Sequence, residues 1–199
     1  MALRDPDKTR RNILDVASAT FHQKGYNGTS LSDILSGALV SKGALYHHFS
    51  NKQELLYAVV DELYKPQFLS RWQGILTAEQ PVEAIAQVVD GIASEGSDEE
   101  MCSGCPIHNI SAELASTDEG LRQRVDAIFT GLQSIIEDGI ERGKALGQIN
   151  EQVDSHRVAL LFMCSLNGMP QMVKSCQDRQ VFFELTGALA DYIRSFQIT

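Results

Sequence analysis

The sequence lacks the features of several large protein classes. No apolar run in the 199 residues approaches the roughly 20 that a membrane-spanning helix needs, so no membrane partner is expected. Alternating β-branched runs and hairpin turns are absent, which argues against a β-sheet. No phosphate-binding loop, Ser/His/Asp set or paired carboxylate site stands out, so the chain is not expected to be an enzyme, and no cofactor or metal is expected. The charged N-terminus has no apolar segment behind it, which excludes a secretory signal and predicts a cytoplasmic protein with reduced cysteines.

Helical periodicity fills most of the remaining chain. Apolar residues recur at the spacing of one helix face, and this pattern predicts an all-α fold of about nine helices. Capping residues such as Ser30, with Asp33 three positions later, mark where helices begin. Pro66 is expected to interrupt the fourth helix, and the acidic stretch "SEGSDEE" is expected to be a solvated loop. The predicted helices cover residues 7–24, 31–38, 42–49, 51–66, 82–93, 106–115, 119–146, 155–173 and 181–196.

Charge divides the chain unevenly. Residues 1–52 hold seven Lys/Arg and four Asp/Glu, a net charge of +3, whereas residues 53–199 hold ten and 22, a net charge of −12. A basic segment on an acidic chain suggests that the front end meets a polyanion. We therefore predict two domains, at residues 1–52 and 53–199.

The basic segment contains two short predicted helices joined by a tight turn, which is a helix-turn-helix arrangement. The second helix of such a pair normally lies in the major groove of DNA, with its N-terminal residues on base edges. Small residues at that end allow close approach, and hydroxyl, aromatic and basic side chains follow within reach of bases or phosphates. The candidate DNA contacts are Thr29, Ser30, Ser41, Lys42, Gly43, Ala44, Tyr46, His47, His48 and Lys52.

Many positions of residues 9–60 resemble the DNA-binding domain of the TetR/AcrR family of transcriptional regulators. The resemblance implies a homodimer that binds a palindromic operator in double-stranded DNA, usually as a repressor, with helical C-terminal residues that form a ligand pocket and a dimer face. One departure concerns the turn, where the family usually has Gly and this chain has Leu39; a positive φ there would cost Leu roughly 1 kcal/mol. The matching residues are Thr9, Arg10, Ile13, Leu14, Ala17, Phe21, Gly25, Tyr26, Thr29, Ser30, Ile34, Val40, Ser41, Lys42, Gly43, Leu45, Tyr46, His48, Phe49, Lys52, Leu55 and Leu56.

The C-terminal helices offer candidates for the dimer face and the pocket that the resemblance implies. Apolar stripes on the last two predicted helices suit either a core or a four-helix bundle between two subunits. The predicted dimer residues are Val158, Leu161, Leu166, Met169, Val181, Leu185, Leu189, Tyr192 and Phe196. The predicted lining of a pocket for a small apolar or electrophilic effector is Phe68, Trp72, Ile75, Val88, Cys105, Ile107, His108, Ile128, Phe129, Leu132, Phe162 and Met163.

The stretch "MCSGCPIHN" places Cys102 and Cys105 in a CxxC pattern before Pro106. Three interpretations stay open: small apolar residues at the start of a helix, a redox or electrophile switch, and a metal site that includes His108. Outside the regulator class, the pair suggests a thiol-disulfide redox protein or a zinc-binding interaction module. The main hypothesis is a dimeric regulator released from DNA by a small ligand or by cysteine modification.

Overall fold

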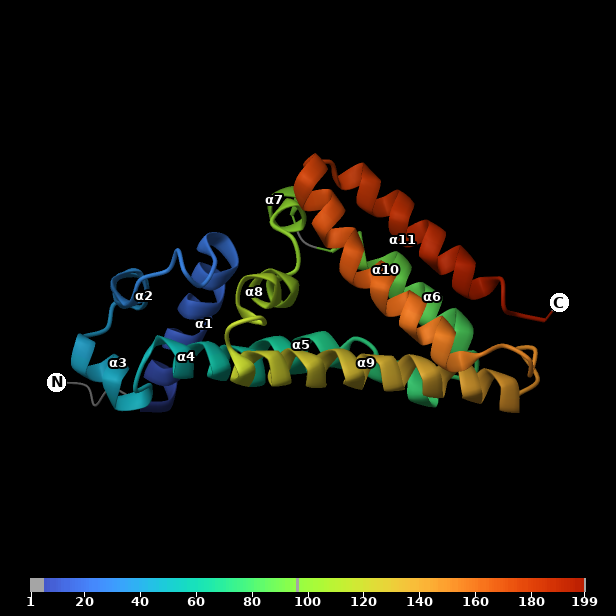
Figure 1. The fold of residues 1–199 in the computed structure, drawn as a ribbon, viewed down its shortest axis with the longest axis horizontal. Coiled ribbons are helices and arrows are strands. Elements are labelled where there is room, and N and C mark those ends of the chain that lie inside the picture. The colour runs from blue at the N-terminus through green and yellow to red at the C-terminus, as the bar shows by residue number, and fades with distance from the viewer. Residues whose placement is uncertain (1–5, 96, 199) are drawn as a thin grey trace. The chain divides into compact units, whose positions relative to one another are not determined.

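A computed structural model describes residues 6–95 and 97–198. Residues 1–5, part of the charged N-terminal segment that argued against a secretory signal, lie outside the described residues. Within the described ranges the all-α prediction is confirmed, because ordered structure there consists of helices and one isolated bridge between Ile149 and Gln197 (Figure 1). None of these helices combines the length and apolar character that crossing a bilayer requires. The α-helices are α1 (Pro6–Lys24), α2 (Leu31–Ala38), α3 (Lys42–His48), α4 (Lys52–Val59), α5 (Lys65–Ser70), α6 (Pro81–Ile92), α7 (Asp98–Cys102), α8 (Pro106–Leu114), α9 (Glu119–Ala145), α10 (Ser155–Cys176) and α11 (Arg179–Arg194).

Helix starts follow the capping residues of the sequence. Ser30 accepts a hydrogen bond from the backbone N–H of Asp33, whose carboxylate accepts from the N–H of Ser30, so the predicted capping box is confirmed. Ser41 caps α3 through the N–H of Ala44, and Asn51 caps α4. These side chains satisfy N–H groups that the first turn of a helix leaves unpaired.

Pro66 does not interrupt the fourth helix, in contrast to the prediction. Between α4 and α5 the chain forms a π-helical turn, η1 (Val60–Tyr64), and the N–H of Lys65 donates to the carbonyl of Val60. The wider turn changes the hydrogen-bond register just before the proline, so the helix accommodates a residue that lacks an N–H. The acidic stretch also differs from the prediction, since part of it forms the short helix α7.

The first of two compact packing units contains residues 1–67 and 106–126. Its core brings one face of α1 against α2, α3 and α4, with α8 also against α1. The fully buried side chains on α1 recur at helical spacing, as expected for an amphipathic helix. They are Ile13, Leu14, Ala17 and Phe21.

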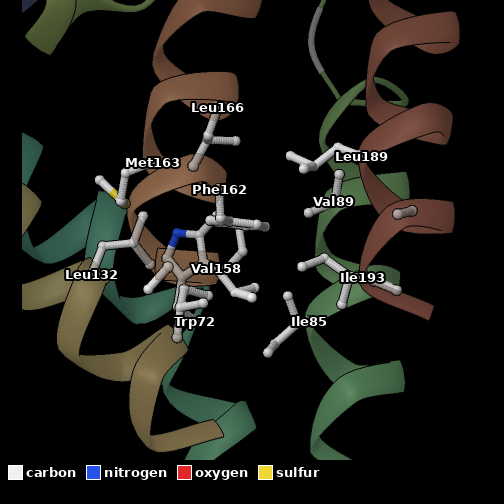
Figure 2. Packing of buried hydrophobic residues seen from close by; sticks show 14 of the residues in the cluster. Trp72, Ile85, Val89, Leu132, Val158, Phe162, Met163, Leu166, Leu189 and Ile193 are labelled. Atoms are coloured by element: carbon white, nitrogen blue, oxygen red, sulfur yellow. The ribbon is translucent and has the colours of Figure 1, made fainter. Parts of the chain in front are cut away.

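The second unit contains residues 68–105 and 127–199. Here α6 packs against α11, and α10 packs against α11 (Figure 1). Figure 2 shows Trp72, Leu132 and Phe162 beside one another on one side of its core, and Val89 and Leu189 on the other; all five belong to one buried cluster. The rings of Trp72 and Phe162 meet edge to face, 5.6 Å between centroids. The two units are defined by packing alone, so the division into two functional domains at residue 52 remains a prediction.

Candidate nucleic-acid interface

Helix α3 presents a polar face to solvent and an apolar face to the first unit's core. Leu45 is fully buried and Phe49 is almost so, which fixes the helix to the body of the unit. Lys42, Tyr46 and His47 lie on the exposed side, and Tyr46 keeps 44% of its surface accessible. The Lys42 ammonium lies 5.8 Å from the centre of the Tyr46 ring, an arrangement that orders both side chains at the surface. Cationic and aromatic groups on one exposed helix face are the chemistry that contacts phosphates and base edges.

Gly43 lies in the first turn of α3, beside the capping residue Ser41. The nearest side-chain atom to a Cβ built at Gly43 is the Oγ of Ser41, 4.0 Å away, so the protein interior does not require glycine here. Glycine inside a helix costs roughly 0.5–1 kcal/mol relative to alanine. Without a side chain at this exposed position, an external group can approach the backbone of α3 closely, as DNA does when a helix lies in its major groove.

Three of the candidate contacts have internal roles. The Thr29 hydroxyl is buried and donates to the carbonyl of Gly25, 2.7 Å away. The Ser30 hydroxyl belongs to the capping box. Lys52 donates to the carbonyls of Tyr26 and Thr29, both at 2.9 Å, and its Nζ lies 4.1 Å from the centre of the Tyr26 ring. These residues hold the turn between α1 and α2. Ser30 is nevertheless exposed, as are five candidate contacts in and before α3: Ser41, Lys42, Gly43, Tyr46 and His47.

His48 and Arg10 are half-buried beside the exposed residues of α3 and α1. Burial lowers the pKa of His48, and the nearby His47 and Arg10 lower it further. The Arg10 guanidinium stacks 5.2 Å from the centre of the Phe49 ring and forms two hydrogen bonds with Glu62. His48 is therefore less easily protonated than an ordinary histidine in the free protein.

Leu39 occupies the turn with φ +52° and ψ +40°, which is the left-handed region. Its side chain is 80% exposed, so little packing offsets the strain of this conformation. The backbone still closes as a helix C-cap, because the N–H of Leu39 donates to the carbonyl of Leu35. Leucine thus adopts the conformation for which glycine is favoured.

Most predicted pocket residues lie in or against the second unit's core. Trp72, Ile75, Leu132, Phe162 and Met163 are buried in one continuous cluster, and Phe68, Val88 and Phe129 are half-buried against it. Ile128 is fully buried. Ile107 and His108 belong to the first packing unit, so their place in a shared pocket stays a prediction.

The predicted dimer stripe lies mainly in the protomer's own core. Val158, Leu166, Met169 and Leu189 are buried there, and a second group is partly covered, formed by Val181, Leu185, Tyr192 and Phe196. Leu161 differs from both groups because half of its surface is exposed. Its exposed apolar companions on α10 and α11 were not singled out from the sequence: Leu160, Met172 and Phe183.

None of the four cysteines, all of which lie in the described ranges, forms a disulfide, and Cys102 and Cys105 are half-buried. The chain reverses at Gly104, which has φ +79°, and Pro106 then begins α8 as the sequence predicts. No group of three or more His, Cys, Asp or Glu side chains in the described parts of the chain is arranged to hold a metal ion. The zinc-binding alternative therefore gains no support from residues 102–108.

Sequence reasoning missed the side chains that tie α8 and the start of α9 to the rest of the first unit. Glu113 accepts hydrogen bonds from two backbone N–H groups of the α1–α2 turn. Asp118 accepts from the Tyr57 hydroxyl at 2.5 Å and from the Gln53 amide at 2.8 Å. These contacts join residues 61 to 87 positions apart, a separation that no local sequence pattern reports.

The fold and the exposed face of α3 define a helix-turn-helix DNA-binding protein. Residues 13–59 match the model of bacterial regulatory proteins of the tetR family, and residues 81–186 match the C-terminal domain of LmrA/YxaF-like transcriptional regulators. The chain belongs to the TetR family of transcriptional regulators, which are not enzymes. Regulators of this family bind DNA and form dimers.

Similar proteins support this assignment along most of the chain. An HTH-type transcriptional regulator from the lacX 3′ region of Lactococcus lactis subsp. lactis is 32% identical over 133 residues, which cover 66% of this chain and 68% of that protein. A TetR transcriptional regulator from Chloroflexus aurantiacus superposes with a TM-score of 0.83 at 28% identity, covering 98% of each chain. SmeT of Stenotrophomonas maltophilia, in a complex with triclosan, shares the fold with a TM-score of 0.78 at 23% identity, covering 96% of this chain and 92% of SmeT.

Proposed function

We propose that the protein is a dimeric repressor that binds a palindromic operator and is released from it by a small effector. The exposed face of α3, with Lys42, Tyr46 and His47 beside a glycine that the interior does not require, is the observation that carries this proposal. In a symmetric dimer, two copies of α3 meet successive major-groove segments about 34 Å apart. Any change in the separation of the two helices then lowers operator affinity.

The proposed dimer face of the protein is the exposed apolar surface of α10 and α11. Leu160, Leu161, Met172 and Phe183 each keep at least 41% of their surface accessible in the single chain. Side chains of this kind gain most by burial between two subunits, because apolar area removed from water contributes about 25 cal/mol per Å². The half-covered Leu185 and Tyr192 extend the same interface at its border.

The proposed effector is a small apolar molecule that binds within the second unit. Support comes from the aromatic and sulfur-containing side chains at its core, among them Phe68, Trp72, Phe129 and Met163. SmeT, which shares the fold, binds triclosan in its solved complex. Because the two binding equilibria are linked, an effector that weakens operator binding must bind more weakly to the operator-bound protein, by the same factor.

Cysteine modification is a second candidate signal. Cys102 ends α7 and Cys105 immediately precedes α8, so a disulfide or an adduct there would change how these helices begin and end. A disulfide requires Cα atoms within about 7 Å of each other, which two cysteines three positions apart can reach in a turn.

The test is binding of the full-length protein to the DNA that flanks its own gene, with thiols reduced and then oxidised. Tight binding with a steep salt dependence is expected, since each phosphate contact adds about −0.9 to the slope of log K against log salt. Loss of binding on oxidation, restored by a reductant, would support the cysteine signal. Binding that ignores oxidation would refute it and leave the small-ligand mechanism. Absence of any operator preference in flanking or selected DNA would refute the repressor proposal.

A further inference from the structure

The turn between α1 and α2, residues 25–29, forms a small anion-binding cradle that the protein fills with one of its own carboxylates. Gly25 has φ +72°, and after this left-handed residue the N–H groups of Tyr26 and Asn27 point the same way. Consecutive N–H groups in such a turn make a concavity that favours anions. The Tyr26 N–H donates to Glu113 Oε2 at 2.8 Å, and the Asn27 N–H donates to Glu113 Oε1 at 2.6 Å.

The Glu113 carboxylate packs closely against Gly25. A Cβ added at Gly25 would lie 3.0 Å from Glu113 Oε2, so both the backbone conformation and the carboxylate require glycine there. The cradle also lies at the C-terminal end of α1, where the helix dipole disfavours negative charge. Two short charge-assisted hydrogen bonds offset that repulsion and hold the carboxylate in one orientation.

The same turn fixes the helix-turn-helix pair. Thr29 and Lys52 donate hydrogen bonds into it, and Ser30, the next residue, caps α2. The turn is therefore the point at which α8 holds the start of α2. Helix α2 leads through Leu39 directly into α3, so the turn that Glu113 holds lies at the start of the helix pair that carries the exposed face of α3.

We propose that Glu113 is a positioning residue for DNA recognition, because its carboxylate holds the α1–α2 turn in the arrangement from which α2 and α3 meet the operator. This inference rests on the proposed repressor function. The carboxylate contributes no contact to DNA, and it sets how often α2 and α3 occupy the arrangement that binds the operator.

The experiment compares Glu113→Gln with Glu151→Gln in the full-length protein. Glu151 lies exposed after α9, and its substitution removes the same negative charge without touching the turn. The probes are an operator duplex selected by the wild-type protein from a randomised library and a random duplex of equal length. Glu113→Gln keeps one acceptor and places an amide against the other N–H, so operator affinity is expected to fall about tenfold. Affinity for the random duplex should stay within about twofold of Glu151→Gln.

A purely structural role of Glu113 would lower the thermal midpoint and both affinities together, and that result would overturn the proposal. So would an unchanged ratio of operator to random-duplex affinity. If Glu113→Gln fails to fold, Glu113→Asp takes its place, because it retains the charge but shortens the side chain. A lower ratio of operator to random-duplex affinity in the folded Asp variant supports the positioning role. A wild-type ratio refutes it. Absence of operator selection by the wild-type protein would instead refute the repressor function itself.

Discussion

Replacing Leu39 with glycine should stabilise the protein, although it removes a large apolar side chain. The left-handed conformation costs a residue with a Cβ roughly 1–2 kcal/mol. Glycine recovers that cost but loses about 0.5–1 kcal/mol through its greater freedom in the unfolded chain. Because Leu39 is 80% exposed, its lost burial amounts to only about 0.4 kcal/mol. At the middle of these ranges, the expected net gain is about 0.3–0.4 kcal/mol in the free energy of unfolding.

Gln177 provides a matched comparison, since it is the other non-glycine residue with positive φ in the described ranges, at φ +55°. Its side-chain amide donates to the carbonyls of Cys102 and Lys174, at 3.1 and 2.7 Å. Each such hydrogen bond contributes about 0.5–1.5 kcal/mol, so Gln177→Gly should leave stability unchanged or lower it. Leu39→Ala, which keeps the Cβ, should be no more stable than the wild-type protein.

Urea unfolding at one protein concentration measures all three variants, because dimer stability depends on concentration. The expected order of midpoints places Leu39→Gly above the wild type, and Gln177→Gly at or below it. A Leu39→Gly midpoint at or below that of Leu39→Ala would refute the reasoning, since backbone strain at residue 39 could not then be the dominant effect.

Three further predictions concern DNA binding and the core. Lys42→Ala should reduce the slope of log affinity against log salt by about 0.9 per protomer, and an unchanged slope in a salt titration would show that Lys42 meets no phosphate. The negative charge of nearby phosphates should favour protonation of His48, whose pKa burial lowers in the free protein. Operator affinity should therefore rise as the pH falls, and His48→Gln should weaken this dependence in binding assays at several pH values. For folding, the lowered pKa of His48 has the opposite effect. The unfolded chain binds the His48 proton more tightly than the folded protein does, so the free energy of unfolding falls as the pH drops through the ordinary pKa of histidine. Trp72→Ala should cost about 3–5 kcal/mol in the free energy of unfolding, and a loss below about 1 kcal/mol in urea would contradict the packing around Phe162.

Helix starts were predictable from the sequence because capping is local. Ser30 and Asp33 are three positions apart, and the side chains that satisfy the first turn of α2 are therefore visible in the sequence itself. The buried faces of the helices were predictable for a similar reason, since apolar residues at helical spacing must face a core. The positive φ of Leu39 follows from neither pattern; only the resemblance, in which the family usually has glycine there, raised that conformation.

Long-range contacts were not predictable in this way. Nothing around Lys52 indicates that its ammonium is held by carbonyls 23 and 26 positions earlier, so the sequence suggested a phosphate contact instead. The acidic stretch suggested a loop, yet Asp98 pairs with Arg179, 81 positions later, and starts a short helix. Pro66 suggested a break that the π-helical turn removes. In each case the deciding partner or backbone register is set by tertiary structure.

The most direct test of the central claim is selection of duplexes from a randomised DNA library by the full-length protein, repeated with a Lys42→Ala and Tyr46→Ala double variant. The account predicts that the wild-type protein enriches inverted repeats whose half-sites lie about one helical turn apart, 34–36 Å. The double variant, with an unchanged circular dichroism spectrum, should lose that enrichment. Equal enrichment of the same repeats by both proteins, or none by the wild-type protein, would contradict the claim that α3 reads the operator.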